Sequence, residues 1–163
     1  MNTDYNLKEI TLAAFEELIL ATDQQVSMRP SADKWSAKEI LGHLIDSATN
    51  NHGRFVRAQL QEDMVFDGYN QDGWVELQEY QMQNWQDLLI TWRQLNMQIA
   101  YLMYITEEDV RTKERAKHNL HQIAFKTVPE HEATTLGYFM EDYVLHLRHH
   151  LGQIRTILSA ASE

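Results

Sequence analysis

The sequence has 163 residues, 44% of them hydrophobic, and its formal net charge at pH 7 is −10. A chain of this length can bury a sizeable core, and we expect one domain over residues 1–163. The negative charge disfavours nucleic acid and anionic membrane surfaces as partners. Because the sequence has no cysteine, it excludes disulfides, zinc sites with thiolate ligands and a protein thiol nucleophile.

The N-terminal residues do not have the basic start and apolar run of an export signal. No window of the sequence approaches 18 consecutive apolar residues, the length that a membrane helix needs. We therefore expect a soluble cytoplasmic protein that does not insert into membranes.

Apolar residues recur at helical spacing in the first half of the chain. The first predicted helix has an apolar face between residues 7 and 18 and ends near Asp23. The second begins at a capping box, in which Ser36 and Glu39 satisfy backbone N–H groups of the first turn. This second helix is predicted to run to about Gln61.

Two further helices are predicted in the second half of the chain. The third carries large apolar residues three and four positions apart between residues 85 and 102, and its two tryptophans are assigned to the core. The last helix begins near Thr134 or Thr135 and ends close to Ser159.

The connections between these helices are long. Residues 63–83 and roughly 104–133 exceed the length of a tight turn, and residues 122–128 have an extended pattern. The sequence therefore predicts an all-α fold: a four-helix bundle with long crossover connections rather than a simple up-down bundle.

His146 and His150 lie one turn apart on the last predicted helix, beside its apolar stripe. This spacing is how a helix offers two ligands to one metal ion, although a chain with eight histidines also contains such pairs by chance. The pair is not the zincin motif, because Leu147 stands where that motif has its catalytic glutamate. His149 points away from the stripe.

A third ligand has to come from another helix, and His43 in the second helix is the best candidate. The helical wheel places His43 on a polar flank with Asp46 and Ser47. A solvent-exposed histidine is an equally good interpretation of that position.

Other polar and aromatic residues are candidates for supporting roles. Asp46 and Asp142 lie within one turn of a candidate ligand, so either can orient an imidazole, the alternative being a solvated acidic residue. Tyr69, Trp74 and Tyr143 can line a substrate pocket or belong to the core.

Two separated groups of residues carry a family resemblance. They occur in the order and at the distance found in the DinB/YfiT-like superfamily of metal-dependent enzymes, and the chain most resembles its bacillithiol-transferase-like branch. The matching residues are Trp35, Ser36, Glu39, Ile40, His43, Leu44, Asp46, Ser47, Asn50 and Arg54, the segment 69–74, and His146, His149 and His150.

The resemblance implies a four-helix bundle of up-down-down-up order, commonly a homodimer, with a divalent metal ion held by His43, His146 and His150. Zinc and nickel both accept imidazole ligands. Two residues depart from the pattern: Asn70 replaces an aspartate common in the transferase branch, and Gln153 replaces a histidine of some relatives. These departures affect the inference about substrate more than the inference about metal.

Three imidazole ligands leave an open position on the ion, which can take water or a thiolate. We therefore expect a small-molecule substrate and either transfer of a low-molecular-weight thiol to an electrophile or hydrolysis. Because the protein has no cysteine, any thiol has to come from a small molecule. The alternative is a non-enzymatic, stress-related bundle that binds a metal or a small ligand.

Overall fold

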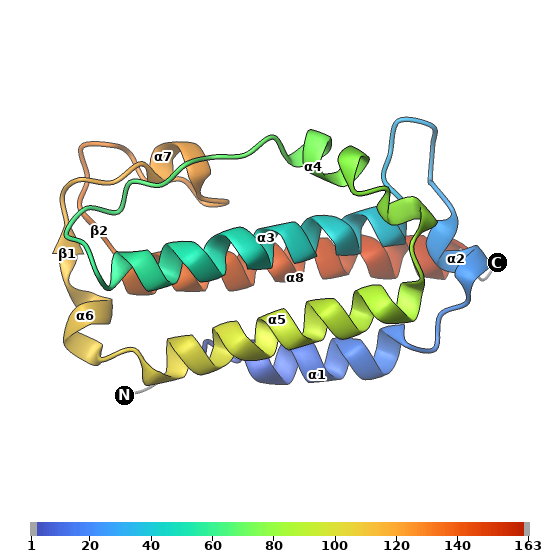
Figure 1. The fold of residues 1–163 in the computed structure, drawn as a ribbon, viewed down its shortest axis with the longest axis horizontal. Helices are drawn as coiled ribbons and strands as arrows, with labels where there is room; N and C mark the ends of the chain where they lie inside the picture. Colours follow the sequence, from blue (N-terminus) through green and yellow to red (C-terminus); the bar gives the residue numbers. More distant parts are fainter. Residues whose placement is uncertain (1–2, 162–163) are drawn as a thin grey trace.

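Four long helices form a bundle in the computed structural model, which describes residues 3–161 (Figure 1). The first and last helices of the bundle run in one direction, and the two between them run in the opposite direction. The predicted four-helix bundle of up-down-down-up order is therefore confirmed. The bundle helices are α1 (Leu7–Leu18), α3 (Ala37–Ala58), α5 (Trp85–Ile105) and α8 (Leu136–Ala160).

The order of the helices explains the length of the first connection. α3 packs against both α5 and α8, and α1 packs against α5. Because α3 and α5 run in parallel, the chain between them returns along the length of the bundle (Figure 1). This first connection contains α4 (Gln71–Leu77) and the 3-10 helix η1 (Tyr80–Met82). The second connection contains α6 (Glu108–Thr112), β1 (Glu114–Arg115), α7 (Leu120–Ile123) and β2 (Thr134–Thr135).

The starts of α3 and α8 follow from local side-chain hydrogen bonds. The Ser36 hydroxyl accepts from the Glu39 N–H at 3.2 Å, and the Glu39 carboxylate accepts from the Ser36 N–H at 2.9 Å, which confirms the predicted capping box. Thr135 caps α8 by accepting a hydrogen bond from the Tyr138 N–H at 3.0 Å. These two caps fix where the helices that carry the histidines begin.

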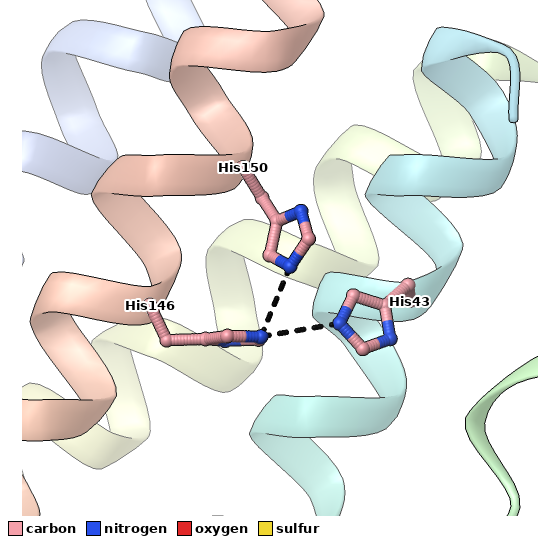
Figure 2. A group of neighbouring side chains, drawn as sticks. All are labelled: His43, His146 and His150. Atoms are coloured by element: carbon pink, nitrogen blue, oxygen red, sulfur yellow. Dashed lines mark hydrogen bonds between the residues drawn. The ribbon is translucent and has the colours of Figure 1, made fainter. Parts of the chain in front are cut away.

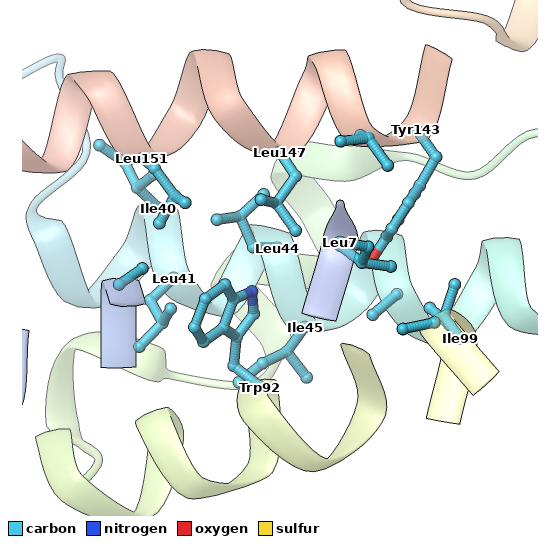
Figure 3. Close-up of a cluster of buried hydrophobic side chains, with 14 of the residues drawn as sticks. Leu7, Ile40, Leu41, Leu44, Ile45, Trp92, Ile99, Tyr143, Leu147 and Leu151 are labelled. Carbon is cyan, nitrogen blue, oxygen red and sulfur yellow. The ribbon is translucent and has the colours of Figure 1, made fainter. Parts of the chain in front are cut away.

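The interior of the bundle is apolar, as Figure 3 shows for the side chains between α3, α5 and α8. Trp92 is fully buried, and Trp85 is buried with its indole N–H donating to the Leu18 carbonyl at 2.9 Å. The assignment of both tryptophans to the core is confirmed. Burial of each large apolar side chain contributes about 1.5–3 kcal/mol to folding.

The bundle helices are amphipathic rather than apolar all round. α5, for example, buries Trp92 and Ile99 and exposes Gln94 and Gln98. Within residues 3–161, no helix combines the length and the apolar character needed to cross a bilayer.

Two local predictions were wrong. The first helix ends at Leu18 rather than near Asp23, because Thr22 starts the separate short helix α2 (Asp23–Ser27) with its own capping box. Residues 122–128 form no strand: α7 covers their beginning, since the Asn119 carbonyl accepts from the N–H groups of the next turn. The two short strands lie elsewhere and pair Glu114 with Thr135 and Arg115 with Thr134.

The two connections are tied to each other above α3. The Asn119 side chain accepts from the Phe66 N–H at 3.1 Å and donates to the Phe66 carbonyl at 2.7 Å. The Met64 N–H also donates to the Lys117 carbonyl at 3.0 Å. These bonds hold the first connection beside the second, where both cover the groove between α3 and α8.

A pair of glycine substitutions tests the packing of the first connection on α3. A Cβ atom at Gly42 would overlap the Tyr80 ring, whose hydroxyl is held by Asp46 at 2.6 Å. We expect Gly42→Ala to lower the free energy of unfolding by about 1–3 kcal/mol through overpacking. Gly152→Ala, in α8 with open space around it, is the matched control and is expected to raise stability by up to about 1 kcal/mol. Urea denaturation measures both, and equal effects of the two substitutions would contradict this packing.

Candidate metal centre

The bundle brings three histidines from distant parts of the sequence together (Figure 2). His43 lies about two turns into α3, while His146 and His150 lie one turn apart on α8. Because α3 and α8 run antiparallel and pack against each other, the two positions on α8 face the one on α3. His43 is buried, with 1% of its surface exposed, so the interpretation of it as a solvent-exposed histidine was wrong.

The Nε2 atoms of the three rings converge. The Nε2 atom of His146 lies 3.2 Å from that of His43 and 3.0 Å from that of His150. All three candidate ligand atoms lie within 4.8 Å of one another. Tetrahedral zinc with Zn–N bonds of about 2.0–2.1 Å holds its nitrogen ligands roughly 3.3 Å apart. The spacing therefore fits one ion shared by the three rings, which is the ligand set predicted from the sequence.

Burial keeps these imidazoles neutral. Desolvation, with a smaller contribution from His150, lowers the pKa of His43 to about 4. Desolvation and the neighbouring histidines lower the pKa of His146 to about 3, and desolvation also lowers the pKa of His150. A neutral imidazole keeps a lone pair for a metal ion, so the three rings are ready to bind at neutral pH.

Two different contacts orient the rings. The Nδ1 atom of His150 lies 2.7 Å from the Oε1 atom of Gln153, an acceptor, so the proton sits on Nδ1 and leaves Nε2 free for a metal. The Nδ1 atom of His43 has no hydrogen-bond partner among residues 3–161, and the ring packs against Trp35 with centroids 5.2 Å apart. Gln153 therefore holds the His150 ring in this orientation.

The two aspartates proposed to orient ligands have other partners. Asp46 accepts from the Tyr80 hydroxyl at 2.6 Å and from the Gln78 amide at 2.8 Å. Asp142 accepts from the backbone N–H groups of residues 125 and 126 at 2.8 and 2.6 Å. Neither carboxylate bonds a histidine in these contacts, and both are buried, so they are not solvated: they anchor the two connections to α3 and α8.

A cavity of about 410 Å³ opens beside the histidines, between α3 and α8 and under the two connections. His146 and His150 line it, so an ion at the three rings would have an open position toward it. Tyr69 and Tyr143 also line it, one of the two roles considered for them, and Tyr143 belongs to the core as well, whereas Trp74 packs on the Tyr69 ring. The remaining lining residues are Ser47, Asn51, Arg54, Gly68, Gln71, Gln122, Ile123, Ala124, Phe125, Phe139, Asp142 and His149.

Several of these lining residues were not assigned to a site by sequence reasoning. Ser47, Asn51 and Arg54 follow His43 at helical spacing on one side of α3, and that spacing was a usable signal. Phe125 packs against His146 with ring centroids 5.5 Å apart. It lies in a connection without periodicity, so no pattern in the sequence indicates its position.

A bundle in which three imidazoles from two helices converge beside a cavity has the architecture of a candidate metal-binding protein. The chain belongs to the DinB superfamily, whose family model matches residues 6–154.

One solved structure with this fold is that of YfiT from Bacillus subtilis, described as a probable metal-dependent hydrolase with an unusual four-helix bundle topology. The TM-score is 0.78 at 19% sequence identity, and the match covers 98% of this chain and 86% of that chain. At this identity the likeness shows the shared fold. No curated protein matches the sequence.

Metal content tests the ligand set. We expect the wild-type protein to retain about one equivalent of zinc or nickel after dialysis, and His43→Ala and His150→Ala to retain little, because each loses one of three ligands. His131→Ala is the matched control, since the His131 side chain is 85% exposed and lies outside the cluster. Elemental analysis gives the stoichiometry, and retention of metal by the His43 variant would show that the ligand set is wrong.

The pH at which zinc is lost tests whether the three imidazole rings are neutral near pH 7. Protons compete with a metal for imidazole nitrogens, and a free histidine protonates near pH 6.5. Because the pKa values of His43 and His146 are lowered to about 4 and about 3, protons compete only at lower pH. We expect zinc to be retained on gel filtration at pH 6 and 5 and lost toward pH 4. Half-loss near pH 6.5, with the helical circular dichroism unchanged, would contradict this.

Proposed function

We propose that this protein is an enzyme that depends on a divalent metal ion and hydrolyses a small substrate, with His43, His146 and His150 as the metal ligands. The observation that carries the proposal is the convergence of three neutral imidazoles, two of which, those of His146 and His150, line a cavity of about 410 Å³. Zinc or nickel bound there would polarise a substrate carbonyl and make water acidic enough to act as a nucleophile near neutral pH.

The protein's own residues would orient the substrate and exclude water. Tyr69 lines the cavity, and burial, together with the nearby Asp46 carboxylate, raises the pKa of its hydroxyl to about 12. The Tyr69 hydroxyl therefore stays protonated and is available as a hydrogen-bond donor to a substrate oxygen. Phe125 and Phe139 provide apolar walls that shield the reacting group from bulk water.

A second candidate reaction uses the same site. In it, the open position would bind the thiolate of a low-molecular-weight thiol, which then attacks an electrophilic substrate. Two observations favour this reaction: the resemblance to the bacillithiol-transferase-like branch, and the absence of cysteine, which leaves the protein without a thiol of its own.

The cluster has too few protein ligands for a structural metal site. Structural zinc sites are closed by four protein ligands, whereas the cluster among residues 3–161 offers three. His146 and His150 line the cavity, so an ion held by the cluster would be accessible to a ligand in it. This arrangement favours the enzyme over a bundle in which the metal has only a structural role.

Chelation provides the functional test. We expect zinc- or nickel-loaded protein to turn over members of a panel of small esters and amides, or of thiol and electrophile pairs. A chelator should abolish turnover while the helical circular dichroism remains, since buried apolar side chains from all four long helices hold the bundle together without the ion. His43→Ala should behave like the chelated protein, and the exposed-site variant His131→Ala like the wild type. Turnover that survives both chelation and His43→Ala would refute the proposal.

A further inference from the structure

Arg54 is a buried cation in the wall of the cavity. Only 4% of its surface is exposed, yet no carboxylate within residues 3–161 forms an ion pair with it. Its Nη2 donates to the Asp67 carbonyl at 2.6 Å, and its Nη1 lies 3.3 Å from the Asn51 Oδ1 atom. Buried arginines are normally paired with an anion, because an uncompensated charge is costly to desolvate.

Among the residues that the structure describes, the Asp67 carboxylate is near enough to act on this charge, but Asp67 is exposed and forms no ion pair with Arg54. Asp142 lines the same cavity, but its carboxylate accepts hydrogen bonds from two backbone N–H groups of the second connection. Burial lowers the pKa of the Arg54 guanidinium, although arginine remains charged in proteins. A divalent ion at the histidines would add further positive charge. The cavity is therefore suited to an anion, although the protein as a whole is acidic.

Arg54 and the histidines lie at different points along one wall. Arg54 follows His43 by eleven residues on α3, which is about 16 Å along the helix axis. Ser47 and Asn51 line the cavity between them, and Phe139 of α8 lines it as well. A ligand whose charged group meets Arg54 would thus extend toward the histidines over a wall that is partly polar and partly apolar.

We propose that Arg54 binds an anionic group of the substrate, a carboxylate or a phosphate, and so directs the other end of the molecule to His43, His146 and His150. The guanidinium fork matches the oxygen spacing of both groups. The inference rests on the proposed function and narrows its substrate class to small anions in which a linker separates the charged group from the reacting group.

Binding of three probes to the wild-type, metal-loaded protein tests this without any assay of turnover. The probes are 4-phenylbutanoate, the neutral 4-phenylbutanamide and 3-phenylpropyl phosphate, measured by isothermal titration calorimetry. We expect at least one of the two anions to bind at least tenfold more tightly than the amide. Preference for the carboxylate or for the phosphate identifies which anion the site takes. Equal binding of all three probes, or no binding of either anion, would overturn the proposal.

Matched variants then locate the anion. Arg54→Gln should weaken binding of the preferred anion at least tenfold and leave the amide unchanged, while Arg54→Lys, which keeps the charge without the fork, should retain part of the preference. Arg57→Gln is the control, because it removes the same charge one turn further along α3 from an exposed side chain. Its dissociation constants should stay within twofold of the wild type.

The controls separate this proposal from the proposed function. Metal content and circular dichroism show whether each variant keeps its fold and its ion; if Arg54→Gln does not fold, the lysine variant and the wild-type probe comparison decide. Anion binding that Arg54→Gln leaves unchanged would place the anion on the metal and overturn the role of Arg54. A protein that discriminates the anions through Arg54 but has no metal-dependent turnover would support the anion site and refute the enzyme.

Discussion

The packing of α3 against α8 is the interaction on which the rest of the structure depends. Leu44 on α3 and Leu147 on α8 are buried in the same core and lie next to the histidines in the sequence (Figure 3). Because the apolar side chains fix how the two helices lie against each other, they also fix His43 opposite the pair on α8. The three Nε2 atoms are thus positioned by rigid helices rather than by loops, which suits a site that has to hold an ion at defined distances.

The up-down-down-up order of the helices provides a cover for the polar side of the α3–α8 pair, which the site also needs. In a simple up-down bundle, consecutive helices run antiparallel and short loops join them. Here α3 and α5 run in parallel, so the first connection runs back along α3 (Figure 1). Its residues Tyr69 and Tyr80 and the tethered second connection bury the polar stripe of α3. Burial lowers the pKa values of the histidines and leaves Arg54 away from bulk solvent, so the connections determine the chemistry of residues that the helices position.

Local patterns predicted the four long helices and two of the three candidate metal ligands. The caps at Ser36 and Thr135 act within a few residues, and the spacing of His146 and His150 is a property of one helix, so both can be predicted from the sequence. The helical wheel alone did not decide whether His43 is a metal ligand or an exposed histidine. A wheel treats a polar flank as open to solvent, because it does not include distant segments of the chain that cover that flank. The family resemblance, rather than the pattern, favoured the ligand over the exposed histidine at that position. The short elements of the second connection have no periodicity and depend on tertiary hydrogen bonds, such as those of Asn119, so their conformation was predicted wrongly in part.

X-ray absorption spectroscopy of the zinc-loaded protein, at the zinc K edge, would test the central claim most directly, because it reports the number and type of ligands around the ion. The account predicts three imidazole nitrogens at about 2.0–2.1 Å and a further light-atom ligand from solvent, which would establish an open three-histidine site. A first shell with two imidazoles, or one closed by a fourth protein ligand, would contradict it.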